Sequence, residues 1–217
     1  MGTIEPINRY TMLTKKQLKL LQPFTKNIFK EMGQRELGRL ANERSNNTVQ
    51  LAFKQFEKEN IITSQKIGTS KRYRLNIGNE KIYDYLTLLK YEGLPKTAIQ
   101  SIEVLKEHIE KYTLFYSLII FGSYASGEQH KKSDLDIVIL LPDKSQEKNM
   151  AIAVNTAKLK SLLPLHVQTL VYDGFIEMLI ANRENVGKEI ARKHQAVHNI
   201  NIFYKSIKKA INHGFNY

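Results

Sequence analysis

The sequence contains no cysteine among its 217 residues. This excludes a disulfide framework and a thiolate metal site, and it fits a reducing, cytoplasmic compartment. Long apolar stretches are also missing, because purely apolar runs such as Leu118–Phe121 extend for only a few residues. We therefore expect no membrane span. The first 21 residues contain no charged segment followed by an apolar one, so we expect no secretory signal.

Acidic residues are scarce in the first third of the chain. Residues 1–80 carry 15 basic and 7 acidic side chains, a net charge of +8, while the whole chain carries +12. Most of the positive excess therefore lies in the first third. Such an excess favours a polyanionic partner, although a solvated, lysine-rich surface produces the same count.

The same region has the pattern of a small helical module with a hairpin. Apolar spacing predicts its helices, with Thr14 as the candidate N-cap of the first. β-Branched and aromatic residues around a Gly-Thr-Ser turn predict two strands. The expected elements are helices at 11–22, 34–42 and 47–59 and strands at 61–63 and 71–75. This order resembles the winged helix-turn-helix DNA-binding domains of prokaryotic regulators over about residues 11–76.

Amide, hydroxyl and cationic side chains lie on the outer face of the third helix and on the hairpin. These are the groups that meet phosphates and base edges of duplex DNA. The candidate DNA contacts are Asn46, Asn47, Thr48, Gln50, Lys54, Lys66, Lys71 and Arg72. Two alternatives stay open. The polar face of any amphipathic helix meets water, and winged-helix folds also mediate protein–protein contacts.

Strands alternate with helices in the rest of the chain, which indicates an α/β arrangement. A linking helix is expected at 80–91, before a break at Glu92–Pro95. The elements expected after it are helices at 97–111, 147–162, 174–192 and 199–212 and strands at 115–121, 135–141 and 165–171.

The stretch GSYASGEQHKKSDLD, residues 122–136, combines two features that suit phosphate chemistry. Gly122 permits a sharp turn after a buried strand and a close approach of phosphate to the backbone, and Ser123 adds a hydroxyl donor. Asp134 and Asp136 are two positions apart, so on a strand their carboxylates share a face at about 7 Å. Two such carboxylates repel each other unless a cation such as Mg²⁺ lies near both. The alternative is a polar loop between two strands.

The motif FGSYASG, followed by SDLDIVI, resembles the signature of the polymerase-β-like nucleotidyltransferase superfamily. It is most similar to the minimal nucleotidyltransferases of archaea and bacteria, over about residues 97–172. The resemblance implies that Asp134 and Asp136 are catalytic and bind Mg²⁺ or Mn²⁺. It also implies that Gly122 and Ser123 bind the triphosphate of an NTP, with Ser133 supporting the strand opening in the nucleotide site. The whole chain resembles prokaryotic proteins that join a winged helix to such a domain.

The sequence departs from this family at one position. Active members carry a third acidic residue on a later strand, but the strand expected at 165–171 has none. His166 and Gln168 share one face of that strand, and Asp173 is the nearest acid. An amide cannot act as a base and is a weaker metal ligand than a carboxylate. Catalysis therefore depends on what lies in this segment.

We predict an α+β or α/β fold, in which a winged helix-turn-helix precedes a nucleotidyltransferase-type mixed sheet with helices and C-terminal helices. The expected parts are 1–79, the winged module; 80–94, the link; 95–173, the nucleotidyltransferase domain; and 174–217, helices packed on it. His194 and His198 are expected to be solvated.

The leading functional hypothesis is metal-dependent transfer of NMP from an NTP to an acceptor hydroxyl, with a winged helix that binds DNA. The alternative is a DNA-binding transcriptional regulator whose transferase domain senses nucleotide or is catalytically impaired. An antitoxin-like role is a third hypothesis. The sequence leaves a homodimer open.

Overall fold

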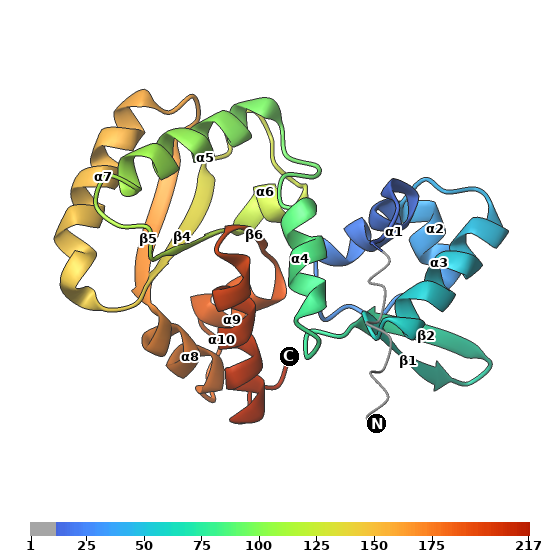
Figure 1. Ribbon diagram of the computed structural model, residues 1–217. Helices are drawn as coiled ribbons and strands as arrows, with labels where there is room; N and C mark the ends of the chain where they lie inside the picture. Colours follow the sequence, from blue (N-terminus) through green and yellow to red (C-terminus); the bar gives the residue numbers. More distant parts are fainter. Residues whose placement is uncertain (1–11) are drawn as a thin grey trace, which may run out of the picture.

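The computed structural model describes residues 12–217 (Figure 1). The first eleven residues lie outside the described part, and with them the start of the expected winged module and half of the segment in which no secretory signal is expected. The described chain forms an N-terminal module of helices and a hairpin beside a larger part built on a four-stranded sheet.

The N-terminal module has the predicted order of elements. It contains α1 (Lys15–Thr25), α2 (Gln34–Leu40), α3 (Asn46–Lys58), β1 (Ile62–Ile67) and β2 (Ser70–Leu75). Thr14 caps α1 as expected. Its hydroxyl accepts a hydrogen bond from the Gln17 amide, and the Gln17 side chain accepts one from the Thr14 amide. On α3, Val49, Phe53 and Phe56 are buried along one side, as the apolar spacing predicts.

The larger part consists of a mixed sheet between two layers of helices. Its strands are β3 (Ser117–Ile120), β4 (Leu135–Leu141), β5 (Leu165–Val171) and β6 (Gln195–His198), in the order β5-β4-β3-β6. β4 and β5 are parallel, whereas β3 runs antiparallel to both β4 and β6. The sheet therefore brings the end of β3 and the starts of β4, β5 and β6 into neighbouring positions.

Helices cover both faces of this sheet (Figure 1). One layer consists of α5 (Lys96–Ile109) and α7 (Glu147–Lys160), and the other of α8 (Tyr172–Ile180), α9 (Val186–Arg192) and α10 (Ile200–Asn212). The remaining elements are α4 (Lys81–Leu88), α6 (Gly122–Ser126) and the 3₁₀ helix η1 (Lys144–Gln146). The alternation along β4 fits this arrangement, since Ile137 and Ile139 face α5 and α7 while Val138 and Leu140 face the other layer.

The C-terminal part differs from the prediction in two ways. The single helix expected at 174–192 is divided into α8 and α9, and β6 adds a fourth strand between α9 and α10. The expected solvation of His194 is also wrong, because its side chain is 1% exposed and its Nε2 lies 3.0 Å from the Tyr204 hydroxyl. Burial lowers the pKa of His194 to about 4. A strand of four residues and the burial of a single histidine are difficult to predict from the neighbouring residues in the sequence.

The two parts of the molecule share one continuous apolar core. This core joins buried residues of α1–α4 to residues of α8, α9 and α10. Tyr83 on α4 stacks on Tyr204 of α10, with ring centroids 5.4 Å apart, and Lys205 pairs with Glu80 at 2.9 Å. Near the C-terminus, Tyr217 stacks on Phe29 at 4.0 Å. The N-terminal module is therefore packed against the sheet-bearing part.

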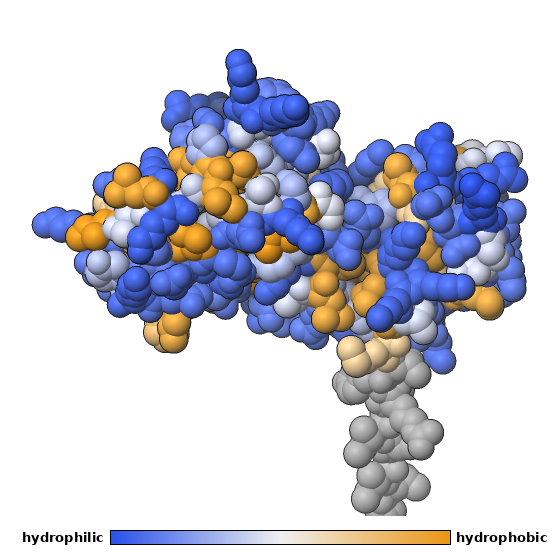
Figure 2. All heavy atoms as spheres, turned by 90° about the horizontal axis from the view of Figure 1, so that it is seen from above, coloured by the Kyte–Doolittle hydropathy of each residue, from blue (hydrophilic) through white to orange (hydrophobic). Residues whose placement is uncertain are grey.

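Seen from above, the surface is mostly hydrophilic, with apolar residues gathered over the part that carries the sheet (Figure 2). Single apolar side chains protrude, such as Leu159 at 88% exposure and Phe115 at 73%. Within residues 12–217, no helix has both the length and the apolar content needed to cross a membrane.

Candidate active site at the end of the mixed sheet

The Gly-Ser turn begins where β3 ends. The Phe121 amide still pairs with the Asp136 carbonyl at 3.0 Å, and Gly122 then turns the chain with a φ of 66° into α6. A Cβ atom at Gly122 would collide with the Asp136 carboxylate. Two features therefore require glycine at this position: the left-handed backbone and the close approach of Asp136.

The two motif aspartates lie at the start of β4, next to this turn. Asp134 is exposed and forms no hydrogen bond or ion pair with the described residues. Asp136 is partly buried between the Gly122 turn and β5. Burial, aided by the negative charge of Asp134, raises the pKa of the Tyr124 hydroxyl, which places Tyr124 near Asp134. The motif thus brings Gly122, Asp134 and Asp136 together, as the sequence predicts.

Ser133 closes the loop that precedes β4. Its hydroxyl accepts a hydrogen bond from the His130 amide at 3.0 Å, and its own amide donates to the His130 carbonyl at 3.0 Å. The loop fixed in this way carries Lys131 and Lys132, which are both exposed. Ser123 follows Gly122 in α6 and is partly exposed beside the aspartates.

The segment in which a third acid was expected places a histidine beside the aspartates. Parallel pairing of β4 and β5 aligns Asp136 with His166, and His166 Nδ1 lies 2.9 Å from Asp136 Oδ1. Gln168 is opposite Val138, two residues further along the strands from the Gly122 turn. Asp173 lies in the first turn of α8, beyond the opposite end of β5, and its carboxylate is 4.0 Å from Lys209. Asp173 therefore cannot complete this site.

The donor set at the sheet end fits a divalent cation. Carboxylate oxygens are the ligands that Mg²⁺ and Mn²⁺ prefer, and the glycine turn leaves room against Asp136 that a side chain would fill. In residues 12–217, no three His, Asp or Glu side chains are already arranged to hold a metal ion. Asp134 or His166 must therefore move when an ion binds.

Residues 101–208 match the family model described as a nucleotidyltransferase domain. The match supports the nucleotidyltransferase superfamily for this part of the chain. A short segment is similar to the protein adenylyltransferase MntA of Shewanella oneidensis, at 45% identity over 42 residues. That segment covers 19% of this chain and 28% of the relative, so less than a third of the relative's length is matched.

The N-terminal module contacts the sheet-bearing part close to the Gly-Ser turn. Lys26, at the end of α1, extends its ammonium group to within about 4 Å of the point where side chains would begin at Gly93 and Gly127. Gly127 ends α6 with a φ of 80°. Burial lowers the pKa of Lys26. Sequence reasoning missed this contact, because no local pattern links residues so far apart in the chain.

The candidate DNA contacts are spread over α3 and the hairpin. Asn46, Asn47, Gln50 and Lys54 are exposed on α3, and the Thr48 amide donates to the capping Ser45 hydroxyl. On the hairpin, Lys66 and Lys71 are directly opposite each other. Lys71 pairs with Glu57 at 2.6 Å and Arg72 with Glu36 at 3.1 Å. Acidic partners therefore offset two of the predicted cations, whereas Lys54 and Lys66 form no such pair within residues 12–217.

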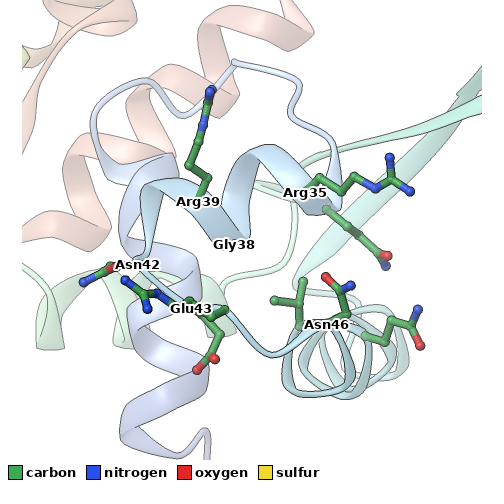
Figure 3. Close-up of a pocket in the computed structure, with 10 residues that line it drawn as sticks. Arg35, Gly38, Arg39, Asn42, Glu43 and Asn46 are labelled. Atoms are coloured by element: carbon green, nitrogen blue, oxygen red, sulfur yellow. The ribbon is translucent and has the colours of Figure 1, made fainter.

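A hollow of about 620 Å³ lies between α2 and α3 (Figure 3). Gly38 allows the two helices to approach, because a Cβ there would lie 3.2 Å from Val49. Arg35 and Arg39 on α2 and Arg44 in the following turn line the hollow, and Asn46 and Gln50 border it from α3. None of the three guanidinium groups has an ion pair or hydrogen bond within the described residues. The sequence analysis counted these charges without singling out the residues.

Proposed function

We propose that the protein transfers a nucleoside monophosphate from an NTP to an acceptor hydroxyl in a reaction that requires Mg²⁺ or Mn²⁺. The packing of the Asp136 carboxylate against the Gly122 turn carries this proposal. In our proposal this turn is the phosphate cradle and the adjacent carboxylate is a metal ligand. The family match over residues 101–208 supports the reaction class.

Each motif residue has a defined task in this proposal. Gly122 lets the triphosphate approach backbone amides, and the Ser123 hydroxyl donates a further hydrogen bond. Asp134 and Asp136 hold the divalent cation, which when bound neutralises charge on the triphosphate. Ser133 keeps the loop before β4 in place through its two hydrogen bonds with His130. The acceptor hydroxyl attacks the α-phosphorus and forms a new P–O bond, while the bond from the α-phosphorus to the oxygen that bridges it to the β-phosphorus breaks. Pyrophosphate leaves, and the hydroxyl proton passes to solvent.

ATP and a protein hydroxyl are the first donor and acceptor to test, because the MntA relative is named a protein adenylyltransferase. The assay follows the label from α-³²P-ATP, and then from the other NTPs, into protein or RNA acceptors. Asp134→Ala and Asp136→Ala should abolish transfer. Asp84→Ala is the matched control, because Asp84 is an exposed aspartate on α4 outside the motif. Labelling that persists in Asp136→Ala would contradict the proposal.

A second candidate function is DNA binding by the N-terminal module as a winged helix-turn-helix. The arginine-lined hollow between α2 and α3 favours it, because three unpaired guanidinium groups suit the phosphates of a duplex. In this hypothesis α3 enters the major groove and the hairpin lies along the backbone. The protein has both functions if the module delivers the catalytic domain to DNA. It has DNA binding without transfer if it is a regulator.

The fluorescence anisotropy of a labelled duplex, measured at several salt concentrations, tests DNA binding. Arg39→Ala should weaken binding and lower the slope of log affinity against log salt by about 0.9 for one lost phosphate contact. Lys158→Ala is the matched control, since Lys158 is exposed on α7 in the other part of the molecule. Affinity that does not depend on salt, or an unchanged slope in Arg39→Ala, would count against this function.

A further inference from the structure

His166 lies on the strand on which the family resemblance leads one to expect an acid. Its backbone is aligned with that of Asp136 by the parallel register of β4 and β5. Its side chain is 56% exposed, and that of Asp136 is 26% exposed. The imidazole therefore lies at the surface of the site, where an incoming ion or substrate can reach it. Gln168, whose strand partner is Val138, lies about 7 Å further along β5.

The separation of the two side chains matches that of neighbouring ligands around one metal ion. Two donors at right angles, each about 2.1 Å from an octahedral ion, lie about 3.0 Å apart. His166 Nδ1 and Asp136 Oδ1 are 2.9 Å apart. The two atoms are therefore at the spacing of neighbouring ligands of one ion.

Asp134 is the adjustable member of this group. It is exposed and forms no hydrogen bond or ion pair with any residue in 12–217, so its side chain can turn without breaking a contact. Asp136 is held from the other side by the backbone at Gly122. Two side chains are thus already in place, and one is free to close the site.

We propose that His166 Nδ1 is the third protein ligand of the metal, beside Asp134 and Asp136, and that it makes the site prefer Mn²⁺ to Mg²⁺. Mg²⁺ favours oxygen ligands, whereas imidazole nitrogen binds the later divalent ions more strongly. A site with three carboxylates would suit Mg²⁺. Replacing one carboxylate with an imidazole raises the affinity for Mn²⁺ relative to that for Mg²⁺. This inference rests on the proposed function for the presence of a metal, but the choice of metal is its own claim.

The test uses the full-length protein and Mn²⁺ alone, followed by electron paramagnetic resonance. Free Mn²⁺ is counted during a titration, and Mg²⁺ is then added as a competitor. Pulsed measurements on the bound ion detect coupling to a directly bonded ¹⁴N nucleus. The wild type should show this nitrogen coupling and should bind Mn²⁺ at least about tenfold more tightly than Mg²⁺.

Three variants test whether the bound nitrogen belongs to His166. His166→Ala should lose the nitrogen coupling and weaken Mn²⁺ binding about tenfold or more, with a smaller effect on Mg²⁺. His166→Asp should also lose the coupling but should bind Mg²⁺ more tightly than the wild type does. His213→Ala is the matched control, because His213 is an exposed histidine directly after α10 whose ring hydrogen-bonds to the Lys209 carbonyl, outside the site. It should leave both affinities unchanged.

The outcomes separate this inference from the proposed reaction. Bound Mn²⁺ without nitrogen coupling, or an unchanged ratio of Mn²⁺ to Mg²⁺ affinity in His166→Ala, would mean that His166 only hydrogen-bonds to Asp136 and would overturn the inference. Absence of Mn²⁺ binding would overturn it as well. Nitrogen coupling without NMP transfer to any acceptor would leave the metal site standing and would remove the proposed reaction.

Discussion

The two ends of the molecule present their candidate functional groups in different ways. At the end of the mixed sheet, strand register fixes the positions of Asp136 and His166, and a glycine turn holds Asp136 from the other side. On the N-terminal module the candidates protrude from α2, α3 and the hairpin, and some, such as Arg72, are paired with nearby acids. The backbone therefore determines where the side chains of the first site lie. In the second, neighbouring acids determine which cations remain available to a ligand.

Outside the two motif aspartates, Gly122→Ala should have the largest effect on activity. The substitution forces a side chain into a left-handed position and against the Asp136 carboxylate. We expect kcat/KM for NMP transfer to fall by at least about 100-fold, the scale of a misplaced catalytic group.

Gly68→Ala is the matched control for this prediction. Its φ of 60° is equally left-handed, but nothing lies within 4 Å of an added Cβ. It should cost about 1 kcal/mol of folding stability and leave transfer intact. Equal transfer rates in the two variants would show that the contact between the turn and Asp136 has no functional weight.

Acid should destabilise the sheet-bearing part of the molecule through His194. Its pKa is lowered from 6.5 to about 4 by burial, so the unfolded chain binds the proton first as the pH falls through 6.5. The stability contributed by neutral His194 is therefore fully present above pH 6.5 and is lost towards pH 4. Between pH 8 and pH 5 the free energy of unfolding should fall by about 2 kcal/mol from this group.

Urea unfolding at the two pH values measures this loss. His194→Gln has no titrating ring, so the wild type should lose about 2 kcal/mol more than the variant over the same range. Equal losses in both proteins would mean that His194 is not the buried base that the structure describes.

On the N-terminal module, unpaired and paired cations should differ in their effect on DNA binding. Lys54→Ala should lower the salt slope by about 0.9, because Lys54 is exposed and has no ion pair within the described residues. Arg72→Ala should change the slope less, since Glu36 already offsets the Arg72 charge at 3.1 Å. Salt titrations of both variants on one duplex test this order, and a larger change in Arg72→Ala would reverse our interpretation of the pairing.

Lys71→Ala should have the smallest effect on stability. It removes a surface ion pair with Glu57, and such pairs contribute less than about 1 kcal/mol. Chemical denaturation of Lys71→Ala beside the wild type measures the change. A loss well above 1 kcal/mol would show that the hairpin depends on this pair.

The sequence predicts the parts of the structure that have strong local signals. The apolar stripe of α3, the Thr14 cap and the strands β4 and β5 are found where periodicity and capping chemistry predict them. Gly122, Asp134 and Asp136 are close because a short connection, α6 and a loop, joins the neighbouring strands β3 and β4.

The features that the sequence did not predict depend on contacts between distant segments. His166 and Gln168 are equivalent on a strand pattern, and only the register with β4 places His166 beside Asp136. The contact of Lys26 with the end of α6 requires the packing of two separate parts. The strand β6 is short and is stabilised by its pairing with β3 rather than by its own composition.

Transfer of label from α-³²P-NTP by the wild type and by Asp136→Asn is the most direct test of the central claim. The substitution keeps the size of the side chain and removes the charge that is to bind the metal. Our account predicts metal-dependent labelling of an acceptor with release of pyrophosphate by the wild type, and none by Asp136→Asn. Equal labelling by both proteins, or no labelling by the wild type with any NTP and acceptor in either Mg²⁺ or Mn²⁺, would contradict it.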